Sequence, residues 1–111
     1  MLEKELEKKF TEKVKATGGR AFKFVSPGND GVPDRLVILP GGHIGFVELK
    51  QKGKKPTKLQ AKQMQRLKDL DCFVYLLDDE KDIDSVIAAI RVCTDSSADL
   101  VLDILEAGGL I

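Results

Sequence analysis

Residues 31–50 of the 111-residue chain read GVPDRLVILPGGHIGFVELK. The apolar, β-branched run at 35–39 and the run at 44–50 are typical of β-strands. The four residues between them, PGGH at 40–43, form a short segment of turn-forming residues, so we expect an antiparallel hairpin. This hairpin is the centre from which the rest of the fold can be predicted.

Helices and further strands are predicted on both sides of the hairpin. In chain order they are a helix over 2–17, a strand over 21–25, a helix from the N-cap Thr57 to residue 70, a strand over 72–77 and a helix capped by Asp82 or Asp84 that ends near Arg91. The helix that begins after Thr57 is long enough to connect two parallel strands. The order αβββαβα therefore predicts an α/β fold, a small mixed β-sheet flanked by helices.

The chain is short enough for one domain, which we place at 1–93, followed by a helical tail at 94–111. Its uncharged apolar stretches are far shorter than the ~20 residues that cross a bilayer. The first ten residues, MLEKELEKKF, lack the apolar core of a signal peptide. These features predict a cytoplasmic protein, of a bacterium or of a phage-infected host cell, with no membrane partner.

Charges are segregated along the chain, although 18 basic and 18 acidic residues cancel. Eight basic residues and no acidic residue lie between positions 50 and 68, whereas nine acidic residues lie between 78 and 106. This pattern favours a basic face that binds a polyanion, with the acidic region turned away from it. Ordinary solvated helix surfaces are the alternative explanation.

Two carboxylates flank the hairpin. Asp34 directly precedes the first strand, and Glu48 lies in the second strand, two residues before Lys50. Strand alternation places Glu48 and Lys50 on one face, and the turn brings the Asp34 end of one strand to the Glu48 end of the other. Adjoining carboxylates repel each other and favour a hard divalent cation such as Mg²⁺ or Mn²⁺. The alternative is a surface ion pair between Glu48 and Lys50, with Asp34 capping a turn.

The segment GVPD at 31–34, a strand and then ELK at 48–50 resemble the PD-(D/E)xK nuclease signature. Together with GKKP at 53–56 and Gln60, the sequence resembles the stand-alone, phage-type VRR-NUC (virus-type replication-repair nuclease) domain over about residues 3–77. The resemblance implies a restriction-endonuclease-like core. It also implies a nuclease that depends on Mg²⁺, for which Mn²⁺ can substitute.

The resemblance implies a role for the residues at the end of the hairpin. Asp34, Glu48 and the main-chain carbonyl of Leu49 would bind the metal, which makes a bound water a better nucleophile. Lys50 would orient that water or neutralise charge on the phosphate in the transition state. Gln60 would contact the phosphate or the lysine.

A glutamate of the first helix usually completes the site in this family. Glu3 lies within the apolar stripe of that helix and Glu7 lies at its margin. The E-x-x-L-E segment at 3–7 resembles the family's E-x-x-I-Q opening, which favours Glu3, whereas counting back from Gly18, as in the related resolvases, favours Glu7. Both remain candidate metal ligands and catalytic residues.

Candidate contacts with DNA phosphates lie in two segments. Ser26 precedes the first strand of the hairpin, although it is also typical of a loop. The others are the lysines that follow the second strand: Lys52, Lys54, Lys55, Lys58 and Lys62. Such contacts bind without reading sequence.

The resemblance predicts a structure-selective endodeoxyribonuclease acting on branched DNA, such as a Holliday-junction resolvase. Junction-cleaving relatives of this fold act as two-fold dimers, so a homodimer is expected. Phe73, Tyr75 and the tail are candidates for the dimer surface. Two alternatives stay open, a non-catalytic nucleic-acid-binding module of the same fold and a nuclease for another substrate.

Overall fold

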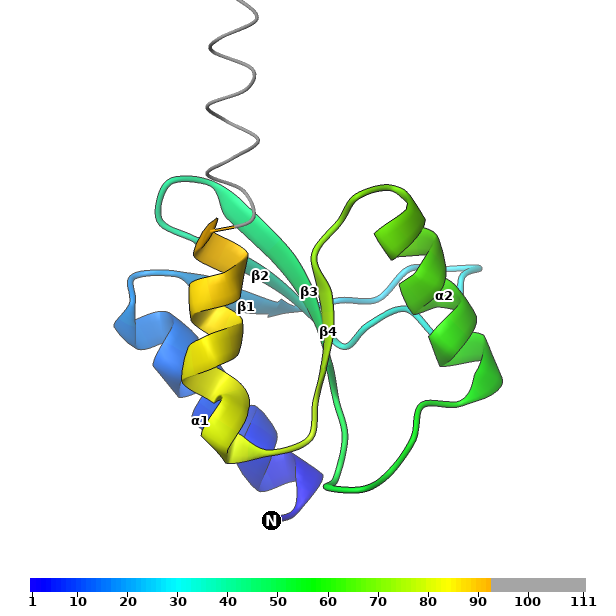
Figure 1. Ribbon diagram of the computed structural model, residues 1–111, viewed down its shortest axis with the longest axis horizontal. Coiled ribbons are helices and arrows are strands. Elements are labelled where there is room, and N and C mark those ends of the chain that lie inside the picture. The colour runs from blue at the N-terminus through cyan, green and yellow to red at the C-terminus, as the bar shows by residue number, and fades with distance from the viewer. Residues whose placement is uncertain (93–111) are drawn as a thin grey trace, which may run out of the picture.

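A mixed four-stranded sheet organises the computed structural model, which describes residues 1–92; the predicted tail at 94–111 lies outside them. The elements are α1 (Glu3–Ala16), β1 (Arg20–Lys23), β2 (Arg35–Leu39), β3 (His43–Leu49), α2 (Lys58–Asp69), β4 (Val74–Leu77), the 3₁₀ turn η1 (Glu80–Asp82) and a helix over 83–92 (Figure 1). This order confirms the predicted αβββαβα arrangement. None of the helices described is long and apolar enough to span a membrane.

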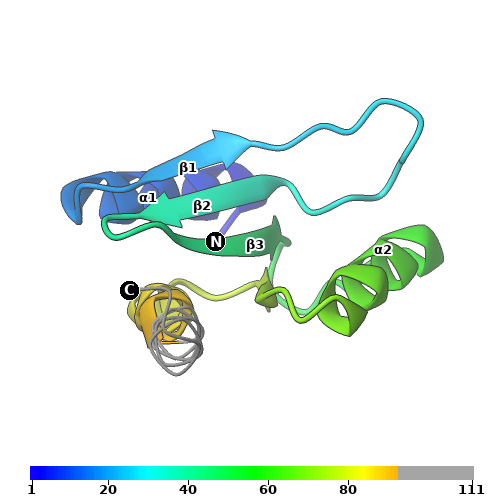
Figure 2. The ribbon, with the colours of Figure 1, turned by 90° about the horizontal axis from the view of Figure 1, so that it is seen from above.

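The sheet has the strand order β1-β2-β3-β4. Strands β1, β2 and β3 pair antiparallel, and β3 pairs parallel with β4. The predicted hairpin is present, with Leu39 opposite His43 at the turn and Arg35 opposite Val47 at the other end. Helix α2 is the predicted crossover between the two parallel strands, and it lies apart from α1 and the helix over 83–92 (Figure 2).

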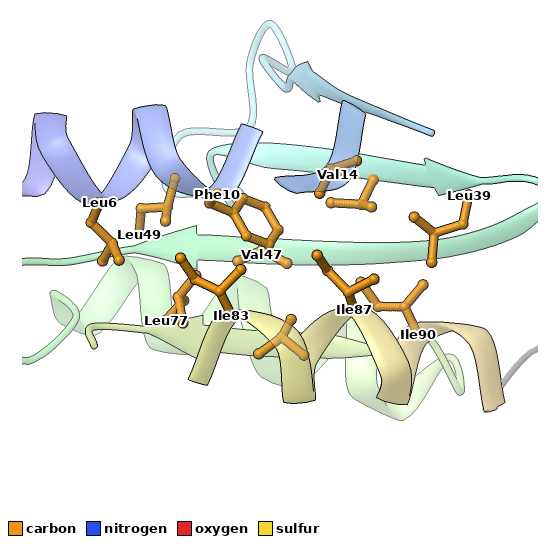
Figure 3. Packing of buried hydrophobic residues seen from close by; sticks show 12 residues of the cluster. Leu6, Phe10, Val14, Leu39, Val47, Leu49, Leu77, Ile83, Ile87 and Ile90 are labelled. Atoms are coloured by element: carbon orange, nitrogen blue, oxygen red, sulfur yellow. The ribbon is translucent and has the colours of Figure 1, made fainter. Parts of the chain in front are cut away.

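The main core lies on one face of the sheet, beneath α1 and the helix over 83–92 (Figure 3). The predicted stripe of α1 is buried there, and Ile83, Val86, Ile87 and Ile90 supply the second helix. Gly45 allows this helix to approach β3 closely, because a Cβ at that position would lie 2.7 Å from Ile90 Cγ1. This helix begins at Ile83, directly after Asp82, one of the two predicted caps, and it follows η1, which Asp79 caps by accepting a hydrogen bond from Lys81 N.

Helix α2 begins at the predicted N-cap Thr57, and one of its two buried residues is polar. Met64 is buried, whereas Leu59 and Leu70 are 46 % and 74 % exposed. Gln63 is buried instead, and its Nε2 donates a hydrogen bond to the Asp30 carbonyl at 3.1 Å. The helix covers the loop over 26–33 as well as the sheet, so a polar side chain is needed where a loop carbonyl meets it.

Candidate active site

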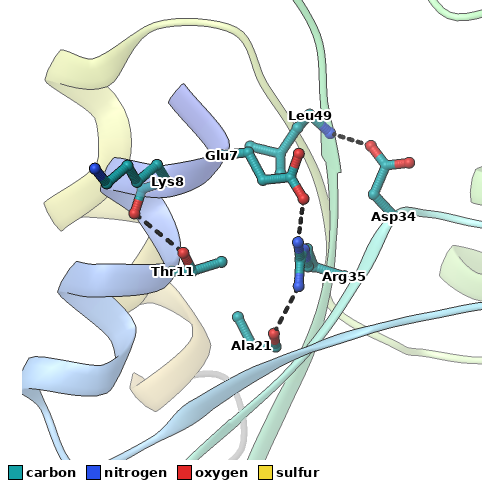
Figure 4. Close-up of polar contacts among 7 residues, drawn as sticks. All are labelled: Glu7, Lys8, Thr11, Ala21, Asp34, Arg35 and Leu49. Carbon is teal, nitrogen blue, oxygen red and sulfur yellow. Dashed lines mark hydrogen bonds and ion pairs between the residues drawn. The ribbon is translucent and has the colours of Figure 1, made fainter. Parts of the chain in front are cut away.

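The hairpin brings the carboxyl groups of Asp34 and Glu48 together. Because Arg35 is opposite Val47 in the antiparallel register, the two carboxylic residues occupy the adjoining positions at the open end of the hairpin. The two carboxyl groups lie close enough for the charge of Asp34 to act on Glu48, and Asp34 Oδ2 accepts a hydrogen bond from Leu49 N at 3.0 Å (Figure 4). The structure therefore brings these two residues together as the sequence predicts.

Glu48 points away from the main core, toward α2. Its neighbours Val47 and Leu49 are buried in that core, so strand alternation turns Glu48 to the opposite face. Glu48 is 1 % exposed, and its Oε1 accepts a hydrogen bond from Gln60 Nε2 at 3.2 Å. The other oxygen, Oε2, is buried without a hydrogen-bond partner in the part of the chain that the structure describes.

The environment of Glu48 disfavours its charged form. Burial, and after it charge repulsion from the adjoining carboxyl of Asp34, together raise the pKa of the Glu48 carboxyl from its usual 4.5 to about 8. The positive charge of Lys50 acts in the opposite direction. Without a cation, Glu48 therefore holds a proton at neutral pH.

The donor set of this pair fits a hard divalent cation. A cation would satisfy the unpartnered Oε2 of Glu48 and relieve the repulsion between the two carboxylates. No group of three or more His, Cys, Asp or Glu side chains is placed to hold a metal within residues 1–92. Two carboxylates suffice for Mg²⁺, which keeps several waters and takes further oxygens from a substrate phosphate.

Within residues 1–92, the structure does not group Glu3 or Glu7 of the first helix with this pair, and their role as metal ligands stays a prediction. Glu7 forms an ion pair with Arg35, whose Nη1 also donates a hydrogen bond to the Ala21 carbonyl at 3.1 Å (Figure 4). Arg35 lies opposite Val47 and so shares the face covered by α1, whereas Glu48 occupies the other face. Glu3 is exposed at the first position of α1.

The Arg35–Glu7 ion pair was missed by sequence reasoning. The available signal was that Arg35 is the one charged residue in an otherwise apolar strand. Its side chain is 17 % exposed, and a buried guanidinium requires an acidic partner. The partner could not be chosen among the glutamates of α1 without the packing of that helix on the sheet.

Two other predicted site residues lie beside the carboxylates. Lys50 follows β3 directly; its backbone N–H donates to the Leu77 carbonyl at 3.0 Å, and its charge lowers the pKa of Glu48. Gln60 donates a hydrogen bond to Glu48, a contact that the sequence did not predict, and its contact with a phosphate or with the lysine stays a prediction. The role of the Leu49 carbonyl as a metal ligand stays a prediction.

Two of the residues predicted to contact DNA already form a polar contact within the protein, and the others form no ion pair there. Lys52 Nζ pairs with Asp79 Oδ2 at 3.1 Å, and Ser26 Oγ accepts a hydrogen bond from Asn29 Nδ2 at 3.0 Å within its own turn. The remaining predicted lysines are exposed and form no ion pair with another residue in 1–92: Lys54, Lys55, Lys58 and Lys62.

Known proteins are similar to this chain in sequence and in fold, although no family model matches it. The chain is 48 % identical over 89 residues to "Putative nuclease p44" of Acyrthosiphon pisum secondary endosymbiont phage 1, a match that covers 80 % of this chain and 95 % of that protein. A solved structure of a VRR-NUC domain superposes with a TM-score of 0.72 and 34 % identity, over 78 % of this chain and 94 % of that one. This chain belongs to the VRR-NUC family.

The VRR-NUC assignment confirms the family and the fold that residues 31–60 predict. It also identifies the protein as a nuclease, and thus as a hydrolase. In this VRR-NUC domain, the open end of the β2–β3 hairpin is where two carboxylates and a lysine converge.

Replacing Glu48 by Gln should stabilise the metal-free protein at alkaline pH. The Glu48 pKa is about 8 in the fold and 4.5 ordinarily, so the native state binds a proton that the unfolded chain has released. The free energy of unfolding of the parent therefore falls as pH rises from about 4.5 to about 8. We expect Glu48→Gln to be more stable than the parent by a few kcal/mol at pH 8 and by little at pH 4.5.

Chemical denaturation of both proteins at the two pH values, in buffer with a chelator, measures this difference. Glu12→Gln, at an exposed position on α1, is the matched control and should behave as the parent. A parent as stable as Glu48→Gln at pH 8 would show that the carboxylate is not destabilised by its surroundings.

Proposed function

We propose that this VRR-NUC protein is a Mg²⁺-dependent, structure-selective endodeoxyribonuclease whose active site is the Asp34–Glu48 pair. The observation that carries the proposal is a buried carboxylate that contacts a second carboxylate and keeps one oxygen unpartnered. Such an arrangement is costly for the fold and is explained by a cation that neutralises it. Mn²⁺, which has similar ligand preferences, is expected to substitute.

Each residue of the site has a distinct chemical task. Asp34 and Glu48 would hold the cation, which when bound offsets the repulsion of a phosphate and lowers the pKa of a water molecule. Lys50 supplies a permanent positive charge beside the carboxylates, where it stabilises the negative charge that develops on the phosphate during attack. Gln60 holds Glu48 in place through its amide N–H₂.

The proposed substrate follows from the charges near the site. The exposed lysines that follow β3 belong to the loop and helix next to Lys50, so they can bind phosphates on either side of the cleaved bond: Lys54, Lys55, Lys58 and Lys62. They offer charge without a base-reading pattern, which favours recognition of DNA shape over sequence. A four-way junction is the substrate that we propose.

Removing a member of the pair or the lysine should abolish cleavage. We expect Asp34→Ala and Lys50→Ala to lose about 100-fold or more in kcat, because each removes a charge that acts on the transition state. The assay compares a synthetic four-way junction, linear duplex and single strands, each with Mg²⁺, Mn²⁺, Ca²⁺ or EDTA. Asp30→Ala, an exposed carboxylate in the preceding loop, is the control and should cleave as the parent does.

The outcomes of this assay separate the candidate functions. Cleavage by Asp34→Ala at the parental rate would contradict the proposed active site. A parent that binds the junction in all conditions and never cleaves it would identify a binding module instead, and cleavage of RNA alone would identify another substrate.

Lysines that are free of ion pairs should contribute more to DNA binding than Lys52. Each phosphate contact that is lost lowers the slope of log affinity against log salt by about 1. We therefore expect Lys54→Ala and Lys55→Ala to bind more weakly and with a smaller slope. Lys52→Ala should change little, since Asp79 already engages that side chain. Binding at several salt concentrations in Ca²⁺ measures this, and an equal loss in all three variants would contradict it.

We also propose that the protein acts as a homodimer, because one domain offers one carboxylate pair and a junction requires two cuts. The surface that fits a second copy is the sheet face that carries Glu48. Phe22 and Ile44 are 49 % and 44 % exposed there, next to the Leu36–Phe46 pair in the register. Phe73 packs against the core instead and is a poorer candidate.

Phe22→Glu should convert the dimer to single chains without touching the carboxylates. Sedimentation equilibrium is expected to give twice the chain mass for the parent and the mass of one chain for Phe22→Glu. Leu70→Glu, on a more exposed leucine directly after α2, is the control and should remain dimeric. A parent that sediments as a single chain would contradict the proposed dimer.

A further inference from the structure

Two glutamines in the first turns of α2 contact the segments that carry the two carboxylates. Gln60 donates to the carboxylate of Glu48, and Gln63, three residues later, donates to the loop that leads into Asp34. Residues three apart on a helix lie on the same side, so both amides belong to one rigid surface. This surface contacts both Glu48 and the loop that leads into Asp34.

The direction of the Gln60 amide is fixed by the start of the helix. Thr57 Oγ1 accepts a hydrogen bond from Gln60 N at 3.1 Å, and Gln60 Oε1 accepts one from Thr57 N at 2.9 Å. This capping box occupies the amide oxygen, so only the N–H₂ group can face Glu48. Glu48 Oε1 receives that donor at 3.2 Å, which leaves Oε2 open.

Gln63 connects the same helix to the loop before Asp34. Its side chain is buried, Nε2 donates to the Asp30 carbonyl at 3.1 Å, and Oε1 accepts from Arg66 Nη1 at 3.5 Å. The loop lies directly on the helix, because a Cβ at Gly31 would be 3.1 Å from Gln60 N. Gly31 also has φ +85°, a conformation that favours glycine.

We infer that Gln60 and Gln63 are positioning residues that together set the separation of the Asp34 and Glu48 carboxylates and thereby the affinity of the pair for a divalent cation. The inference rests on the proposed metal-binding role of that pair. A divalent cation binds the pair with both carboxyl groups ionised, and two ionised carboxylates repel, so their separation stays fixed only if each is restrained from outside. Helix α2 supplies the restraint on both, and neither glutamine needs to touch DNA.

Direct Mn²⁺ binding by the full chain without DNA tests this inference. Gln60→Met and Gln63→Met keep the size of each side chain and remove the donor. Loss of a partner that orients a metal ligand typically weakens metal affinity by about 10-fold or more, and we expect that loss in both variants. Gln65→Met is the matched control, because Gln65 is an exposed glutamine of α2 whose amide donates a hydrogen bond to Asp69, and it should bind Mn²⁺ as the parent does.

A further variant separates positioning from helix capping. Gln60→Glu keeps the oxygen that accepts from Thr57 N but replaces the donor that faces Glu48. We expect an unchanged KM for DNA and a kcat about 10-fold lower at saturating Mg²⁺. Parental kcat in Gln60→Glu would mean that Gln60 serves the helix alone, and would overturn the inference for this residue. If Gln63→Met fails to fold, the Gln60 variants decide the question.

The results distinguish this inference from the proposed function. A parent that binds Mn²⁺ but cleaves no DNA, with weakened binding in both variants, supports the inference and refutes the nuclease proposal for DNA. A parent that cleaves DNA while Gln60→Met and Gln63→Met bind Mn²⁺ as tightly as Gln65→Met overturns the inference alone. A parent that binds no Mn²⁺ overturns both.

Discussion

The contact between the carboxyl groups of Asp34 and Glu48 is the interaction on which the rest of the structure depends. Glu48 is 1 % exposed, so both its burial and the neighbouring Asp34 disfavour the charged form of its carboxyl group. The fold offsets this penalty only in part, with the charge of Lys50 and the amide of Gln60. Oε2 of Glu48 remains without a hydrogen-bond partner among the described residues, and the proposed cation site rests on this atom.

The apolar core and the candidate active site lie on opposite faces of the sheet. On one face, α1 and the helix over 83–92 bury the apolar core, and the Arg35–Glu7 ion pair lies at its edge. On the other face, α2 covers only the end of the sheet where Glu48 points. A large core on one side allows an unfavourable buried acid on the other, because the free energy of apolar burial greatly exceeds the penalty of one carboxylate.

Sequence reasoning predicted what local rules determine. A four-residue turn between apolar runs determines the hairpin and so the meeting of Asp34 with Glu48, and Thr57 with its capping pattern determines where α2 begins. It failed where the partner comes from a distant element. The burial of Gln63 depends on how the loop over 26–33 lies across α2, and the engagement of Lys52 depends on the turn after β4. The hydrophobic pattern within a single segment does not predict its contacts with a segment far away in the sequence.

Titration of the Glu48 side-chain carboxyl carbon, followed by NMR in metal-free buffer, tests the carboxylate pair most directly. The structure predicts an apparent pKa of about 8 for this group, a lower value in Asp34→Asn, and a lower value again when Mg²⁺ is added to the parent. An apparent pKa near the ordinary 4.5 in the metal-free parent, unaffected by Asp34→Asn, would contradict the coupling of the two carboxylates and the cation site built on it.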